Sequence, residues 1–338
     1  AVFKFRTDNV EIYGLDSTLF SDGVLEEGYE DLIEPWTSQN EVLKALNRFI
    51  DISRDLAIDA FDETSGDSDV VVVEKVVNEN VHMINVLCLC YRERIGYIKV
   101  HDENGQAQAR NLAKIFEQAR SHHLRSLNKI GQSAAGIGIA EHYKDMQTLV
   151  LLVINESQFM STVLNDPGVV AHDREETQVK MDKMQARVQR YFKTFGEEWA
   201  NAFFDTHLSN YRSYGLLVEA EKFRKPLTRY LRAEKARGRL CWINDVLQEG
   251  DFQEASTALT NLAQEQEVKF WNKKVELSLA KLTSLAAAEE TGSKGNAELL
   301  NGDLTVVNTQ EAIRQHLQYI LYAAVDIEAE VQLACDAY

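Results

Sequence analysis

The scarcity of proline is the feature of this sequence that most constrains its fold. Only Pro35, Pro167 and Pro226 interrupt 338 residues. Because proline removes a backbone donor and clashes with the preceding helical turn, long stretches without it can remain helical. Apolar residues recur at steps of three and four over most of these stretches, which is the period of an α-helix. We therefore expect an all-α protein, an irregular and α-solenoid-like stack of helices with short links and almost no strand.

The chain divides into four parts by pattern. Residues 1–37 lack helical periodicity and are predicted to form an extended leader. Residues 38–135 form a first helical block that begins at a capping-box pattern, Ser38-Gln39-Asn40-Glu41. Residues 136–288 form an irregular stack, and residues 289–338 comprise a linker and a terminal helix. The expected helices span residues 42–61, 70–100, 107–130, 132–144, 145–164, 172–195, 197–208, 211–222, 226–237, 239–248, 252–266, 268–288 and 309–337.

The helix predicted over residues 268–288 carries two apolar stripes on different sides. The stronger stripe consists of Val268, Trp271, Val275, Leu279, Leu282 and Leu285. The weaker stripe consists of Phe270, Leu277, Ala280, Ser284 and Ala288, and it is bordered by Lys273, Lys274 and Lys281. A helix at the edge of a fold needs only one apolar face, so a second face needs a second partner. Either the chain covers both faces itself, or one face docks another protein.

The charge of the chain excludes one class of partner. A net charge of −17 argues against general binding to DNA or RNA, whose phosphates would be repelled. One local exception is a basic cluster between residues 222 and 239. It is interpreted either as solvated helix faces and C-terminal caps or as a contact with an acidic protein surface. Its members are Lys222, Arg224, Lys225, Arg229, Arg232, Lys235, Arg237 and Arg239.

The sequence shows no pattern for a catalytic, cofactor or metal site. Gly136-Ile137-Gly138-Ile139-Ala140 superficially resembles a phosphate-binding turn, but no strand precedes it. His122 and His123 are expected to be surface histidines, because nearby arginines disfavour a metal ion. The four cysteines, Cys88, Cys90, Cys241 and Cys335, are not at zinc spacing and are expected to be reduced, buried thiols. No apolar run is long enough to cross a bilayer.

Three stretches of the sequence resemble the C-terminal helical region of the nucleoporin 133 family. They are IAEHYKDMQTLVLLV (139–153), RYFKTFGEEWANAFFDTHL (190–208) and LCWINDVLQEGDFQEASTALTNLAQEQEVKFWNKKVELSLAKLTSLA (240–286). The most specific positions are Ala140, Glu141, Tyr143, Lys144, Asp145, Lys273, Lys274, Leu277, Leu279, Lys281, Leu282 and Leu285. PWTSQNEVLKALNRFIDISRDLA (35–57) resembles the start of the helical region in the same family.

This resemblance implies a structural role rather than an enzymatic one. Members of the family are scaffold proteins of the Y-shaped coat of the nuclear pore, with a β-propeller before the helical stack. The resemblance implies that this fragment contains no β-propeller and stops short of the family's terminal helices. It also implies a place in the nucleus at the nuclear envelope and support for pore assembly and for mRNA and protein transport. Neither a cofactor, a specific nucleic acid nor direct membrane contact is implied.

The resemblance also implies a partner, nucleoporin 107, which is also called nucleoporin 84. The weaker stripe and its lysines would meet this partner, helped by the terminal helix around residues 313–333. Trp271, Val275, Leu282 and Leu285 would hold the helix to its own stack. The predicted partner-binding residues are Phe270, Lys273, Lys274, Leu277, Leu279, Ala280, Lys281 and Ser284.

Two other functions stay open at the level of sequence. A helical solenoid subunit of a vesicle coat or tethering complex would have a similar stack of long helices, and the place of the protein in the cell would distinguish it. An all-α enzyme would need polar groups clustered in an interior pocket with perturbed ionisation. The sequence offers no such cluster.

Overall fold

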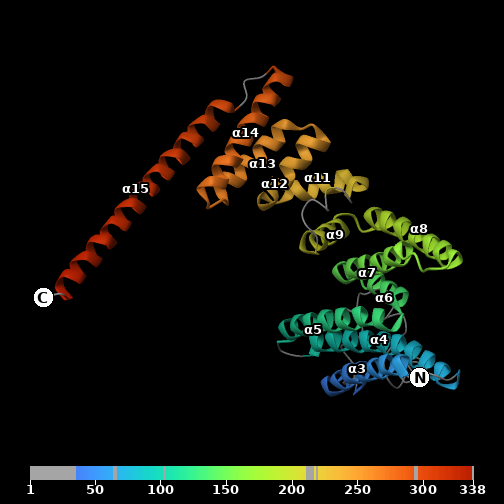
Figure 1. The fold of residues 1–338 in the computed structure, drawn as a ribbon. Helices are drawn as coiled ribbons and strands as arrows, with labels where there is room; N and C mark the ends of the chain where they lie inside the picture. The colour runs from blue at the N-terminus through green and yellow to red at the C-terminus, as the bar shows by residue number, and fades with distance from the viewer. Residues whose placement is uncertain are drawn as a thin grey trace. The chain divides into compact units, whose positions relative to one another are not determined.

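The computed structural model confirms an all-α fold. It describes residues 36–63, 67–101, 104–210, 217, 220–292 and 296–336, and these ranges contain helices and turns but no strand. Most of the extended leader predicted over residues 1–37 lies outside the described residues, as does much of the short helix predicted over 211–222. The chain forms two compact units, up to Ala202 and from Phe203, and each is described by itself. Figure 1 shows the succession of helices along the chain.

The first unit is built from helices that pack mainly on their neighbours in sequence (Figure 1). The helices are α3 (Asn40–Glu63), α4 (Asp67–His101), α5 (Gly105–Ser126), α6 (Ser133–His142), α7 (Met146–Asn165), α8 (Ala171–Thr194) and the first half of α9 (Gly196–Asn210). Short 3-10 turns precede α3 and follow α5, at Trp36–Ser38 and Leu127–Ile130. The largest fully buried side chains of this unit include Ile50, Ile84, Leu87, Leu124, Leu127, Ile137, Leu149, Tyr191 and Trp199.

The turn between α6 and α7 explains why the stretch 139–153 has its particular polar residues. Asp145 caps α7 by accepting a hydrogen bond from the backbone N–H of Thr148 at 3.1 Å. The same carboxylate pairs with the buried Arg120 of α5 at 3.0 Å. Glu141, at the end of α6, accepts hydrogen bonds from Arg187 and Tyr191 of α8. These charged residues therefore link α5, α6, α7 and α8.

The second unit holds a further succession of helices. They are α11 (Arg224–Ala233), α12 (Gly238–Asn244), α13 (Phe252–Glu265), α14 (Phe270–Thr291) and α15 (Ala297–Asp336). The predicted cap of α13 is confirmed, because the Asp251 carboxylate accepts from the backbone N–H of Glu254 at 3.1 Å. Gly238 lets α12 approach α13 closely, since a Cβ there would lie 2.8 Å from the carbonyl oxygen of Ala258. A π-helical turn (Asp245–Glu249) follows α12 directly.

The terminal helix is longer than the sequence indicates. It begins at Ala297 and not near residue 309. Gly302 and the β-branched run Thr305, Val306 and Val307 lower the helix propensity of this segment. The segment is helical nevertheless, because Leu300 and Val307 are almost fully buried in the core of the second unit and this burial outweighs the low helix propensity. In the described part of the chain, no helix has a stretch apolar and long enough to span a bilayer.

Half of the basic cluster pairs with acids of the same unit. Arg232 contacts the fully buried carboxylate of Asp245 at 3.2 Å, and Lys235 contacts Glu265 at 2.6 Å. Arg237 pairs with Asp205, and Arg239 pairs with Glu267 and Glu276. These four residues therefore link the segment from α11 to α12 to the neighbouring helices, although the side chains of Lys235 and Arg239 remain about half exposed, as a solvated face implies.

Candidate interaction surface

Helix α14 lies between α13 and α15 and has one buried face. Leu277 and Ala280 are 0% exposed, and Ser284 is buried beside them. The Ser256 hydroxyl of α13 donates a hydrogen bond to the carbonyl oxygen of Ala280 at 2.8 Å, which fixes how closely the two helices approach. The core around this face consists of Leu259, Leu262, Ala263, Leu277, Ala280, Leu300 and Val307, with Trp242, Phe270, Leu279 and Leu304 packed against it.

The other face of α14 is exposed and apolar. Trp271 is 68% exposed and Leu282 is 61% exposed, and Val275 and Leu285 are exposed between and beyond them. Steps of four, seven and three place these four side chains along one side of the helix. We call Trp271, Val275, Leu282 and Leu285 the outer stripe. Val268, just before the helix, is also exposed.

The prediction for the two faces of this helix is therefore wrong. The face assigned to a partner is buried in the core, and the face assigned to the core is exposed. The physical reason is that helices approach closely through small side chains. Ala280 and Ser284 face a helix that carries small buried residues of its own, Ala255 and Ala263. Large side chains on both helices would hold them further apart.

The predicted partner-binding residues fall into two groups in the structure. Leu277, Ala280 and Ser284 are inaccessible to a partner while the unit is folded. The remaining five, Phe270, Lys273, Lys274, Leu279 and Lys281, are partly buried. Phe270 and Leu279 pack against the core described above, so only their outer atoms are available. Helical spacing places Lys274 and Lys281 between the two faces, where they border the outer stripe, and places Lys273 on the side of Ala280 and Ser284.

Buried charge fixes α14 to α12. Glu276 is buried and accepts a hydrogen bond from Nε of Arg239 at 2.8 Å. Burial raises the pKa of Glu276, and the bond to Arg239 opposes that rise without cancelling it. Glu267, which also pairs with Arg239, has a lowered pKa, chiefly because it accepts the backbone N–H of Lys269. The guanidinium of Arg239 therefore bridges α14 and the link that precedes it, which makes the outer stripe a fixed feature of the unit.

Helix α15 adds a second exposed apolar stripe. Its side chains recur mostly at steps of seven, with two shorter steps, along the helix. They are Leu299, Val306, Ile313, Leu317, Ile320 and Ile327, all exposed, and we call them the α15 stripe. Every side chain from residue 312 to residue 320 is exposed, so this part of the helix has no buried face within the described chain. Sequence reasoning missed the outer stripe as an exposed surface, although its apolar spacing is visible, whereas it assigned the terminal helix around residues 313–333 to the partner-binding surface.

Comparisons with known proteins agree on one family. The family described as "Non-repetitive/WGA-negative nucleoporin C-terminal" matches residues 1–338. Nucleoporin NUP133 of Chaetomium thermophilum is 25% identical over 98% of this chain and 25% of its own length. Nucleoporin nup132 of Schizosaccharomyces pombe is 24% identical over 95% of this chain and 26% of its own length. Nuclear pore complex protein Nup133 of Drosophila melanogaster is 27% identical, with coverages of 92% and 22%. The chain thus spans about a quarter of the length of these relatives.

Proposed function

The chain belongs to the family of non-repetitive nucleoporin C-terminal regions, and from this premise we propose that it is a scaffold segment of the nuclear pore complex. It is a nuclear pore protein of the nuclear envelope. The proposal assigns it no catalytic role and no cofactor. Its proposed role is structural: the stack of helices presents an apolar surface to a neighbouring subunit.

The proposed partner is nucleoporin 107 in the Y-shaped coat, through which the segment supports pore assembly and the transport of mRNA and protein. The observation that carries this proposal is the outer stripe of α14, supported by the α15 stripe. Monomeric proteins rarely expose contiguous apolar surface of this kind without a binding role. Helical scaffold subunits join through such faces because burial of apolar side chains needs no special chemistry.

A comparison of the free energy of apolar burial with the cost of association indicates that tight binding needs both stripes. Fully burying one large apolar side chain contributes about 1.5–3 kcal/mol. The four side chains of the outer stripe are already partly covered, so they contribute roughly 5 kcal/mol together. Association costs about 4–15 kcal/mol in lost freedom of motion. The outer stripe alone therefore gives weak binding, and a partner that also covers the α15 stripe can bind tightly.

Two lysines that border the outer stripe give the surface a local positive charge. Lys274 and Lys281 are partly buried on a chain whose net charge is −17. They would attract an acidic rim on the partner. Exchanging Lys281 for Glu is expected to weaken binding mildly, and more so at low salt than at high salt.

The test is calorimetric titration of nucleoporin 107 from the same organism into variants of this chain. Leu282→Glu should remove most binding, because a charge would be buried unpaired at the centre of the contact. Leu247→Glu is the matched control, since Leu247 is 72% exposed in the same unit, against 61% for Leu282, but lies outside both stripes. Circular dichroism melts should show that both variants are folded. Wild-type affinity for a folded Leu282→Glu variant would refute the assigned surface.

A further inference from the structure

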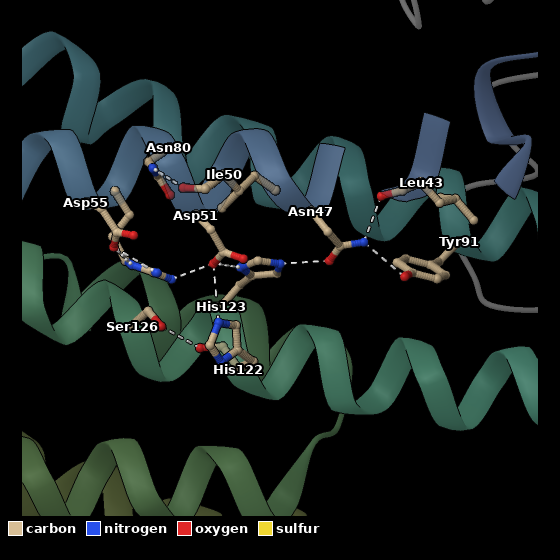
Figure 2. Close-up of polar contacts among 11 residues, drawn as sticks. Leu43, Asn47, Ile50, Asp51, Asp55, Asn80, Tyr91, His122, His123 and Ser126 are labelled. Carbon is tan, nitrogen blue, oxygen red and sulfur yellow. Dashed lines mark hydrogen bonds and ion pairs between the residues drawn. The ribbon is translucent and has the colours of Figure 1, made fainter. Parts of the chain in front are cut away.

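One carboxylate and two imidazoles meet between α3 and α5, inside the first unit (Figure 2). The ligand atoms of Asp51, His122 and His123 all lie within 4.8 Å of one another. Nε2 of His122 is 3.2 Å from Oδ1 of Asp51, and Nδ1 of His123 is 3.6 Å from the same oxygen. The sequence-based expectation that both histidines are surface residues is wrong for His123, which is 2% exposed.

The hydrogen bonds of Asn47 determine which nitrogen of His123 carries the proton. The Asn47 amide nitrogen donates to the carbonyl oxygen of Leu43 at 2.8 Å and to the Tyr91 hydroxyl at 3.0 Å. Its amide oxygen therefore faces His123 and accepts from Nε2 at 2.8 Å (Figure 2). A neutral imidazole carries one proton, so Nδ1 is left with a lone pair.

This lone pair is buried and directed at another acceptor. Nδ1 of His123 is enclosed and has no hydrogen-bond partner, and a carboxylate oxygen of Asp51 lies 3.6 Å from it. Two groups that both accept repel each other unless a cation lies between them.

We propose that Asp51, His122 and His123 bind a divalent transition-metal ion of the Zn²⁺ class. Zn²⁺ binds His nitrogen and Asp oxygen at about 2.0–2.2 Å in a tetrahedron, which places neighbouring ligand atoms about 3.3 Å apart. The two separations of 3.2 Å and 3.6 Å lie on either side of that value. Three protein ligands leave a fourth position for water, and His122, whose side chain is 59% exposed, marks the open side.

Two neighbouring side chains affect the proposed site: Asn47 orients the ligand His123, and the positive charge of Arg54 opposes binding of a cation. Asn47 fixes the ring of His123 with Nδ1 free, which is the usual role of a hydrogen-bonding group behind a metal ligand. Arg54 donates to Asp51 at 2.7 Å and competes with a metal ion for that oxygen. It also donates twice to Asp55, at 3.0 Å and 2.9 Å, so its guanidinium can remain on Asp55 when the ion takes Asp51.

A bound ion would join α3 to α5 directly. These two helices both pack on α4, and His122 and Asp51 are separated by 71 positions in the chain. The ion therefore adds a link between distant parts of the first unit, so its binding should raise the thermal stability of the folded chain.

The experiment titrates Zn²⁺ alone into the metal-free full chain and follows heat and melting temperature. Co²⁺ serves as a second probe, because a tetrahedral site gives visible absorption bands. We expect one saturable site and a higher melting temperature with the metal. His122→Ala should weaken binding at least tenfold while leaving the fold intact, since this side chain is mostly exposed.

Three variants make the result decisive. Arg54→Gln should tighten binding, because it removes the competing cation. His172→Ala removes an exposed histidine on α8 and should bind as the wild type does. If His122→Ala does not fold, Asp51→Asn replaces it, with the same expected loss. The proposal is overturned if the wild type binds no Zn²⁺ saturably, or if folded His122→Ala and Asp51→Asn bind as tightly as the wild type.

Discussion

Replacing Leu277 by Ala should destabilise the second unit far more than replacing Leu282 by Ala. Leu277 of α14 is fully buried in the core that α14 forms with α13 and α15. Truncating this side chain therefore removes buried atoms and leaves a cavity. For such a site the loss is about 3–4 kcal/mol. Leu282 is 61% exposed, so its truncation removes less than half of a buried side chain. The expected loss there is about 1 kcal/mol or less, partly offset by the higher helix propensity of Ala.

Differential scanning calorimetry of the full chain measures this difference. The two units can melt separately, so hydrogen exchange of the α14 amides identifies the transition that moves. A loss of about 3–4 kcal/mol should lower the melting temperature of this unit by roughly 6–16 °C, against a few degrees for Leu282→Ala. Equal losses for the two variants, or a larger loss for Leu282→Ala, would refute the assignment of the buried and exposed faces.

Three further outcomes test other parts of the structure. Gly238→Ala should cost about 1–3 kcal/mol, because its Cβ would lie within 2.9 Å of Leu262 Cβ and nearer still to the Ala258 carbonyl oxygen; urea denaturation measures it, and an unchanged midpoint would contradict the close approach. Burial raises the pKa of Glu141, but hydrogen bonds from Arg187 and Tyr191 outweigh it and leave the pKa lowered. Glu141→Gln should therefore be less stable than the wild type at pH 7, and the gap should narrow as pH falls below about 4; a gap independent of pH would argue against the pairing. Burial raises the pKa of Cys88 and Cys241 to about 12, so peptide mapping after iodoacetamide should find them alkylated only once the chain is denatured.

Much of the fold is predictable from local pattern. Long apolar stripes without proline indicate the helices, and Asp251 ahead of an apolar run indicates where α13 begins. The start of α15 is not predictable in this way. Gly302 and its β-branched neighbours have weak helix propensity, and only contacts with α13 and α14 make them helical. Such contacts depend on the three-dimensional arrangement, which local pattern does not contain.

The sequence predicts that α14 carries the candidate surface, but it does not predict which face of α14 is exposed. The spacing of Leu277, Ala280 and Ser284 identifies a second face on α14, and size alone suggests that the larger side chains are the buried ones. Packing reverses this, because the small residues of α13 admit the small residues of α14. The cluster of Asp51 and the two histidines could not be predicted for another reason. Asp51 lies 71 positions before His122 in the chain, and it meets the adjacent pair of histidines only across two packed helices.

The packing of each helix on its neighbours in sequence also governs how the chain reaches its native state. Contacts that close short loops require little loss of chain entropy, so a stack of this kind has low contact order and folds fast for its length. Each helical pair can form soon after it leaves the ribosome, without waiting for the end of the chain. The buried face of α14 is complete only when residues 297–307 of α15 have been synthesised, because Leu300 and Val307 close that core. Until then the part of this face that α15 covers is open together with the outer stripe, so the nascent chain exposes more apolar surface in this interval than the folded unit does.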